Sequence, residues 1–75
     1  MKNFIEFIIK QIVKNPDDVV IEEEREGDVV KIKICANTED MGAIIGKSGK
    51  TVRNIRAVAK TKAIREGIKV YIDVC

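Results

Sequence analysis

Two glycines three positions apart, Gly46 and Gly49, bracket Lys47 and Ser48 in the second half of the chain. Because glycine has no side chain, a phosphate backbone can approach the main chain closely at such a point. A helix that begins directly after Gly49 would add unpaired N–H groups and a partial positive charge, and Lys47 and Lys50 would add full charges. The pattern in this context therefore predicts a phosphate-binding loop, although a GxxG pattern alone is a weak signal and more often marks only a tight turn between helices.

The charges around this loop are distributed unevenly. The net charge is only +2, but the run from Met41 to Arg65 contains no acidic residue. All twelve acidic residues lie outside that run, where they outnumber the seven remaining basic residues. Such asymmetry favours a polyanion that binds on one side of the molecule. The basic residues of the run are Lys47, Lys50, Arg53, Arg56, Lys60, Lys62 and Arg65.

Other site chemistry has little support in the sequence. There is no histidine, and the two cysteines, Cys35 and Cys75, are forty positions apart, so the four ligands of a zinc site are missing. No nucleophile lies at a plausible spacing from a general base, so we expect a protein that is not an enzyme and needs no cofactor. Lysine or carboxylate chemistry is the alternative that composition leaves open. We expect Cys35 to be a small strand residue without a disulfide, and the protein to be cytoplasmic.

Hydrophobic periodicity indicates which elements must position the loop. Apolar residues in adjacent pairs four apart predict a helix over residues 4–14, which Asn3 can cap and Asn15-Pro16 ends. Residues 18–24 and 28–35 are typical of two antiparallel strands joined at Gly27. The glutamates of this hairpin are expected to be solvated, and a magnesium site is the lesser alternative because a flexible hairpin is poorly preorganised. They are Glu22, Glu23, Glu24 and Glu26.

The rest of the chain predicts two helices and a strand. Residues 37–40 are typical of a helix start capped by Thr38, and the short helix over 41–45 ends at Gly46. A longer helix follows Gly49 and ends at Gly67. Residues 68–74 alternate as a strand with Tyr71 on its outer side. The result is one α+β domain over residues 1–75, in which three helices cover the apolar face of a sheet.

No stretch approaches the roughly 20 apolar residues that cross a bilayer, and the N-terminal segment has neither a basic leader nor a small-residue cleavage site. We therefore expect no membrane association.

The run IIGKSGKTVRNI, residues 44–55, resembles the signature of the KH domain, an RNA-binding module whose GxxG loop clamps the backbone of four nucleotides. The element order α-β-β-α-α-β is similar to the type II arrangement, and the whole chain resembles the small stand-alone bacterial KH proteins of the KhpA-like family. The resemblance implies a type II KH fold with a three-stranded mixed sheet. It also implies single-stranded RNA binding, and a homodimer or a heterodimer with a larger KH-containing protein.

The resemblance assigns roles to residues of this chain. Gly46 and Gly49 match the glycines of the clamp, and Lys47 and Ser48 match its variable middle pair. One of two neighbouring isoleucines would line the binding groove while the other joins the core. Gly42 either admits a base or is only a glycine at a helix start. The remaining implied RNA-binding residues are Lys50, Arg53, Ile44 and Ile45.

We therefore expect single-stranded RNA to bind through the loop and an adjacent aliphatic groove, with the protein acting as an RNA chaperone or regulator. Single-stranded DNA remains an open alternative, because a phosphate clamp fits both backbones. Base stacking on aromatic rings is not expected to dominate, because aromatic residues are few. The alternative function is a protein-interaction or dimerisation module with weak or no nucleic-acid binding.

Overall fold

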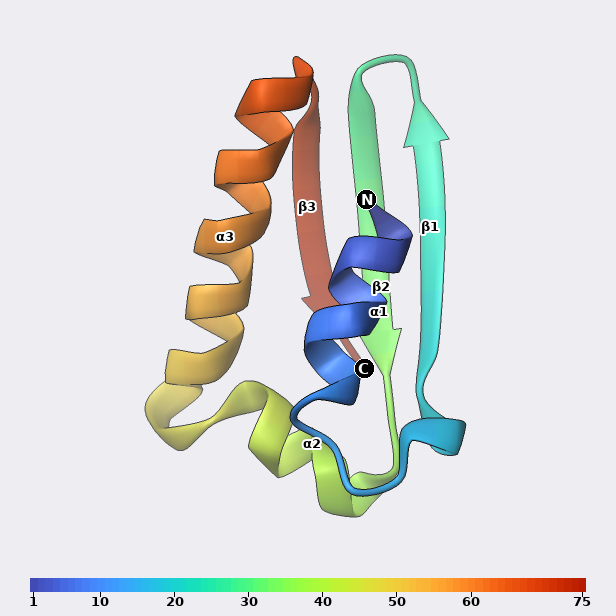
Figure 1. The fold of residues 1–75 in the computed structure, drawn as a ribbon, viewed down its shortest axis with the longest axis vertical. Helices are drawn as coiled ribbons and strands as arrows, with labels where there is room; N and C mark the ends of the chain where they lie inside the picture. Colours follow the sequence, from blue (N-terminus) through green and yellow to red (C-terminus); the bar gives the residue numbers. More distant parts are fainter.

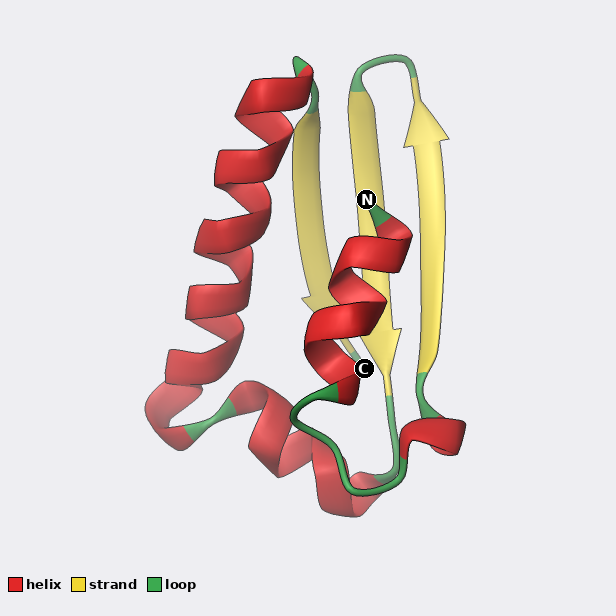
Figure 2. Ribbon diagram, viewed as in Figure 1, coloured by secondary structure: helices red, strands yellow, loops and turns green.

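A computed structural model describes residues 1–75, in which one face of a three-stranded sheet is covered by helices (Figures 1 and 2). The sheet contains β1 (Val20–Glu26), β2 (Val29–Cys35) and β3 (Lys69–Val74), in the order β1-β2-β3. β1 and β2 pair antiparallel, whereas β2 and β3 pair parallel. The observed order, helix-strand-strand-helix-helix-strand, confirms the predicted α+β fold with a mixed sheet.

Helix α1 (Lys2–Lys10) is shorter than the sequence predicted. Met1 precedes it without a side-chain cap, so the expected cap at Asn3 is wrong. The helix ends before Lys14 because the chain turns toward α2, where the backbone N–H groups of Lys14 and Asn15 donate to the Asp40 carboxylate at 3.0 and 2.9 Å. A 3₁₀ turn, η1 (Pro16–Asp18), then leads into β1, which begins two residues later than expected.

The core lies between the sheet and the helices and is entirely aliphatic. Val30, Ile32 and Ile34 of β2 all point into it, as the alternation predicted. On β1 only Ile21 is buried, since α1 does not cover the whole hairpin. Figure 1 shows α1 in front of β2 and α3 alongside β3, both on the same face of the sheet. The buried cluster comprises Ile5, Ile9, Ile21, Val30, Ile32, Ile34, Ile44, Ile55, Ala59 and Ile72.

Helices α2 (Thr38–Ile45) and α3 (Lys50–Glu66) flank the loop, with a 3₁₀ turn, η2 (Lys47–Gly49), between them. The cap of α2 is Asn37, not Thr38: its side-chain oxygen accepts from the Glu39 N–H at 2.9 Å. Helix α3 ends at Gly67, which adopts the left-handed conformation that the sequence predicted. No helix of the fold combines the length and apolar composition needed to cross a bilayer.

Cys35 and Cys75 form a disulfide, which corrects the expectation that Cys35 is an unpaired strand residue. The parallel pairing of β2 with β3 explains the bond. Ile34 lies opposite Val74, so the next residue of each strand reaches the same level of the sheet. The two Cα atoms are 5.1 Å apart, within the range that a disulfide spans. The sequence could not predict this contact, because the two cysteines are forty positions apart and the sequence does not specify which strands pair.

Candidate nucleic-acid interface

The Gly46–Gly49 loop has an unusual backbone. Gly46, Ser48 and Gly49 all have positive φ angles, of 77°, 56° and 75°. Gly46 combines its φ with a ψ of 174°, a region that is essentially restricted to glycine. Ser48 is the only non-glycine residue of the chain with positive φ. These angles turn the chain from the end of α2 into the start of α3 within four residues, which leaves Lys47 and Ser48 exposed.

Gly46 has a further, purely steric reason to lack a side chain. A Cβ placed there would overlap the Thr51 side chain and would lie only 2.7 Å from the Thr51 backbone nitrogen. At Gly49 and Gly42, by contrast, an added Cβ would meet nothing within 4 Å. Gly46 therefore allows the first turn of α3 to pack against the loop, whereas the open space beside Gly49 and Gly42 is available to a ligand.

The start of α3 is well suited to hold an anion. Gly49 provides no side-chain cap, and the first turn contains no acidic residue, so nothing in the chain neutralises the positive end of the helix dipole. Lys47, Lys50 and Arg53 are all exposed around it. None of the three takes part in an ion pair, so their charges remain free for a ligand.

The structure distinguishes the two isoleucines before the loop. Ile44 is fully buried in the core cluster, whereas Ile45 retains accessible surface. Of the two, only Ile45 can therefore contact a ligand. Gly42 lies exposed on α2, in a position open to either of the roles considered for it.

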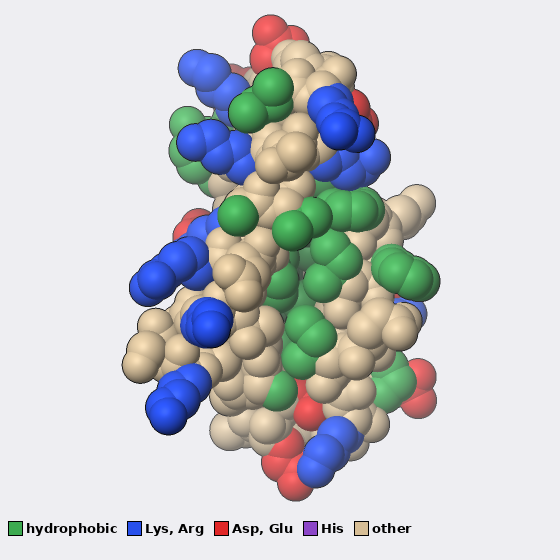
Figure 3. Space-filling model, turned by 60° about the vertical axis from the view of Figure 1, so that its left-hand side comes forward, with side chains coloured by type: hydrophobic (Ala, Val, Ile, Leu, Met, Phe, Trp, Pro, Cys, Tyr) green, Lys and Arg blue, Asp and Glu red, His purple; other side chains and the backbone are tan.

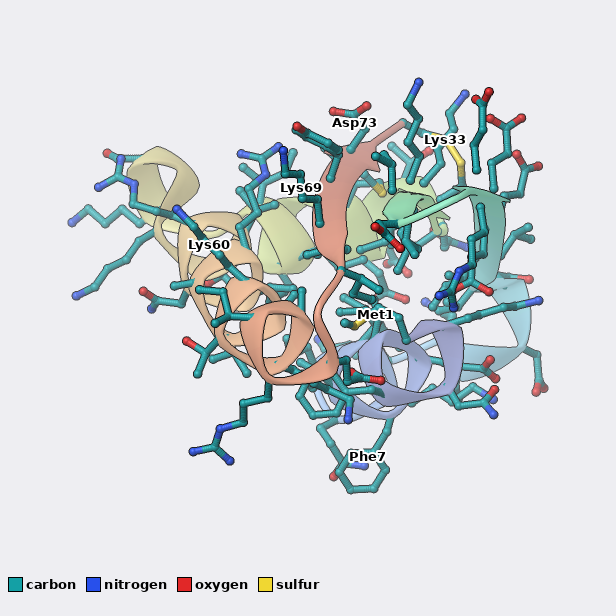
Figure 4. All side chains as sticks on the ribbon, turned by 90° about the horizontal axis from the view of Figure 1, so that it is seen from above. Met1, Phe7, Lys33, Lys60, Lys69 and Asp73 are labelled. Carbon is teal, nitrogen blue, oxygen red and sulfur yellow. A yellow bond between two sulfur atoms is a disulfide. The ribbon has the colours of Figure 1, made fainter.

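A hollow of about 520 Å³ lies between α3 and the edge strand β3. Of its seven lining residues only Val70 and Ile72 are aliphatic, and none comes from α2 or the loop, so this hollow is not the aliphatic groove that the sequence predicted. Four of its other lining residues are charged and one is aromatic. Figure 4 labels two of the charged ones, Lys60 on α3 and Asp73 on β3. The charged and aromatic residues are Lys31, Arg56, Lys60, Asp73 and Tyr71.

The sequence did not predict this hollow. Arg56 and Lys60 were counted only as members of the basic run, and Tyr71 only as an outward-facing strand residue. The Arg56 Nε–H donates to the carbonyl oxygen of Ile72 at 3.0 Å and so ties α3 to β3. The sequence contained one indication of this surface. The basic residues at 53, 56 and 60 lie along one face of the predicted helix that follows the loop.

The acidic residues of the hairpin lie elsewhere. Glu22 pairs with Lys33, and Glu24 with Lys31, across β1 and β2. Alternating charges of this kind are typical of a solvated strand surface. Four of the twelve acidic residues thus lie on β1, at the opposite edge of the sheet from α3 and the loop.

Comparison with known proteins agrees with this geometry. A family model described as KhpA/KhpB, KH domain, matches residues 2–74. Proteins named RNA-binding protein KhpA from Clostridium perfringens and Halalkalibacterium halodurans are 36% and 34% identical over 74 residues. Each alignment covers 99% of this chain. It covers 99% of the Clostridium perfringens protein and 97% of the Halalkalibacterium halodurans protein. The KhpA protein of Chlamydia trachomatis is 31% identical over 99% of this chain and 95% of its own length.

A solved structure shares the fold. The crystal structure of Aquifex aeolicus Era Y63A bound to GDP·AlF₄⁻ superimposes with a TM-score of 0.67 at 20% sequence identity. The match covers 97% of this chain but only 28% of that protein, so it supports the fold alone. The family match and the full-length relatives together show that the chain belongs to the KhpA/KhpB KH-domain family.

Proposed function

We propose that this protein binds single-stranded RNA by holding its sugar-phosphate backbone against the Gly46–Gly49 loop. One observation carries the proposal: exposed main chain with three positive φ angles meets the uncapped start of α3, surrounded by three unpaired basic side chains. Backbone N–H groups, helix dipole and ammonium groups all favour phosphate there. The full-length relatives named RNA-binding proteins support the same function.

In this mechanism the loop supplies affinity, and the accessible apolar surface next to it supplies any base preference. Lys47, Lys50 and Arg53 neutralise phosphates, and about four nucleotides lie along the loop and the start of α3. Ile45 contributes apolar contact with a base. We expect a dissociation constant in the micromolar range, about −8 kcal/mol, because a single small module buries little surface. Weak, reversible binding of this kind fits an RNA chaperone or regulator.

A binding role is favoured over a catalytic one by the state of the cysteines. Both are bonded to each other, so no free thiol is available as a nucleophile. Histidine, the commonest general base, is absent.

The decisive experiment is a titration of labelled single-stranded RNA with the wild type and the Lys47→Asp/Ser48→Asp double variant. Aspartate tolerates the left-handed conformation of position 48 better than most residues, so the variant should fold normally. We expect it to retain the wild-type circular dichroism spectrum and to lose measurable binding, because two acidic groups would repel the phosphates.

A matched control is available on α1. The Lys2→Asp/Asn3→Asp variant makes the same change in net charge at two exposed positions of the first helical turn, where acidic residues are favourable. It should bind RNA with nearly wild-type affinity. Equal affinity of all three proteins would refute the clamp. Parallel titrations with single-stranded DNA and duplex RNA of the same sequence decide which nucleic acid is preferred.

The surface between α1 and α3 supports a second candidate function, association with another protein or a second copy of the chain. Hydrophobic side chains gather between these helices, with basic residues around them (Figure 3). A hollow there is lined by Phe4 and Val58, and Lys62 lies 5.2 Å from the centre of the Phe4 ring. Light-scattering measurements of mass, with the wild type and a Val58→Asp variant, test this candidate. A concentration-dependent dimer that the variant abolishes would support it.

A further inference from the structure

Tyr71 lies on the edge strand β3, away from the proposed clamp and next to the middle of α3. It lies on the face of the sheet opposite the helices and is 56% exposed. It lines the 520 Å³ hollow between α3 and β3, and also a neighbouring hollow of about 360 Å³ farther along the same two elements. Lys60 and Val70 line both hollows as well. The tyrosine therefore lies between two neighbouring hollows, together with one aliphatic and one cationic residue that also line both.

The charges around Tyr71 favour an anionic ligand. Lys31 lies directly opposite Tyr71 in the pairing of β2 with β3, and Arg56 and Lys60 approach from α3. Against these three cations the hollow contains one carboxylate, that of Asp73. The hydrogen bond from Arg56 to the Ile72 carbonyl oxygen fixes the guanidinium over the edge of β3. Its two terminal nitrogens remain available to donate to a ligand.

The hollow lies on a continuous path from the clamp. Arg53, Arg56 and Lys60 follow one another along α3 at spacings of three and four, which places them on one face of the helix. At a rise of about 1.5 Å per residue, Arg56 and Lys60 lie about 10 and 16 Å along the axis from Gly49. A strand that leaves the loop along this ridge reaches Tyr71 at the far end of the basic face.

We propose that Tyr71 is a stacking platform for a base of the bound strand, outside the four nucleotides held by the clamp, with Arg56 and Lys60 holding the adjoining phosphates. This inference rests on the proposed function and extends its footprint over the edge of β3. It assigns a recognition role to the single aromatic residue of the strand. An exposed ring with cations beside it is the combination by which proteins bind unpaired bases without sequence preference.

The composition of the chain gives a direct probe. Tyr71 is the only tyrosine and there is no tryptophan, so the intrinsic fluorescence excited at tyrosine wavelengths comes from this residue alone. Stacking of a base on the ring quenches that fluorescence. Titration with an eight-nucleotide RNA should therefore quench the emission in proportion to binding, whereas a four-nucleotide RNA that fills only the clamp should leave it nearly unchanged.

Affinity measurements with substituted proteins provide the second arm. Tyr71→Leu should weaken binding of the eight-nucleotide RNA by about tenfold and leave the four-nucleotide RNA within about twofold, and Tyr71→Phe should restore the loss. The matched control is Phe7→Leu, which removes an exposed aromatic ring, 66% accessible, from α1 on the other side of the molecule (Figure 4). It should change neither affinity. Because Tyr71 and Phe7 are both exposed, neither variant disturbs the core.

The outcomes separate this inference from the proposed function. Both are supported if the Lys47→Asp/Ser48→Asp variant loses binding to both RNAs and Tyr71→Leu selectively loses affinity for the longer RNA. The stacking platform alone is overturned if the Lys47→Asp/Ser48→Asp variant loses RNA binding but RNA does not quench the Tyr71 fluorescence of the wild type. The same holds if Tyr71→Leu and the wild type bind the eight-nucleotide RNA with equal affinity. Equal weakening of both RNAs by Tyr71→Leu would place the ring inside the clamp and overturn the extended footprint. Failure of the wild type to bind either RNA would overturn both.

Discussion

Gly46 and Gly42 lie four residues apart but have opposite requirements. At Gly46 both the backbone angles and the proximity of Thr51 exclude a side chain, whereas Gly42 lies within α2 with open space around it. The first glycine is therefore needed for the loop to fold. The second is conformationally replaceable, and any need for it would have to come from a ligand.

Alanine substitutions at the two positions should separate these roles. Gly46→Ala should destabilise the protein by about 1–3 kcal/mol, because alanine is forced into a glycine-only conformation against Thr51. Gly42→Ala should stabilise it by up to about 1 kcal/mol through helix propensity. Thermal unfolding measures both.

The RNA affinity of the Gly42→Ala variant then tests the remaining role of that residue. A stable variant with weakened RNA binding shows that a base approaches position 42. Unchanged affinity leaves Gly42 as a glycine without a binding role. A Gly46→Ala variant as stable as the wild type would contradict the steric account of the loop.

At the scale of elements, one buried carboxylate links α2 to the segment that follows α1. Asp40, on α2, accepts hydrogen bonds from the backbone N–H groups of Lys14 and Asn15 and from the Asn15 side chain. The hydrogen bond from Lys14, followed by those from Asn15, outweighs desolvation and lowers the pKa of Asp40 below its ordinary value of 3.8. The ionised form thus holds the segment after α1 against the helix that precedes the loop.

The pH dependence of stability should follow from this shift. A carboxylate with a lowered pKa in the folded state stabilises the fold above its unfolded pKa, and that contribution disappears as the pH falls through the folded value. Asp40→Asn should therefore lower the melting temperature by several degrees at pH 7, since one acceptor oxygen becomes an amide donor. The difference between variant and wild type should shrink below about pH 4. Unfolding curves at pH 7 and pH 3 check this, and a difference independent of pH would refute it.

The disulfide joins β2 to β3 at the ends that face α2. Closing a loop of 40 residues should stabilise the fold by about 4 kcal/mol, chiefly by restricting the unfolded chain. A Cys35→Ser/Cys75→Ser variant should melt at a lower temperature than the oxidised wild type and should not respond to reductant. RNA affinity should stay the same, since neither cysteine lies in the loop or lines the hollow beside Tyr71. If the melting temperature of the wild type does not change on addition of reductant, this account is contradicted.

Hydrophobic periodicity and turn residues predicted most of the fold, because the forces that form helices, strands and turns are local. Alternating valine and isoleucine identified the buried face of β2, and Gly67 marked the end of α3. What depends on pairing between distant segments was not predictable. The disulfide follows from the register of two parallel strands, and the hollow beside Tyr71 exists only because α3 packs against β3. The early end of α1 likewise depends on Asp40, which lies 26 residues beyond Lys14.

The molecule as a whole separates its charges. Basic residues follow α3 and the loop, while acidic residues follow β1 at the opposite edge of the sheet. A polyanion approaching the α3 side is attracted, and one approaching the β1 side is repelled. In the proposed function, this polarity would orient an RNA strand toward the clamp before any specific contact forms.

Salt dependence measures how much of the binding this separation supplies. Lys47, Lys50 and Arg53 would neutralise about three phosphates, so the logarithm of the affinity for a four-nucleotide RNA should fall with the logarithm of salt concentration at a slope near −2. Affinity should then drop roughly tenfold to twentyfold between about 50 and 200 mM salt. Lys50→Gln should reduce the slope by about 0.7, and Lys2→Gln, on α1, should leave it unchanged. A slope near zero would mean that apolar contact, rather than phosphate at the start of α3, holds the RNA, because counterions are released only where backbone charge is neutralised.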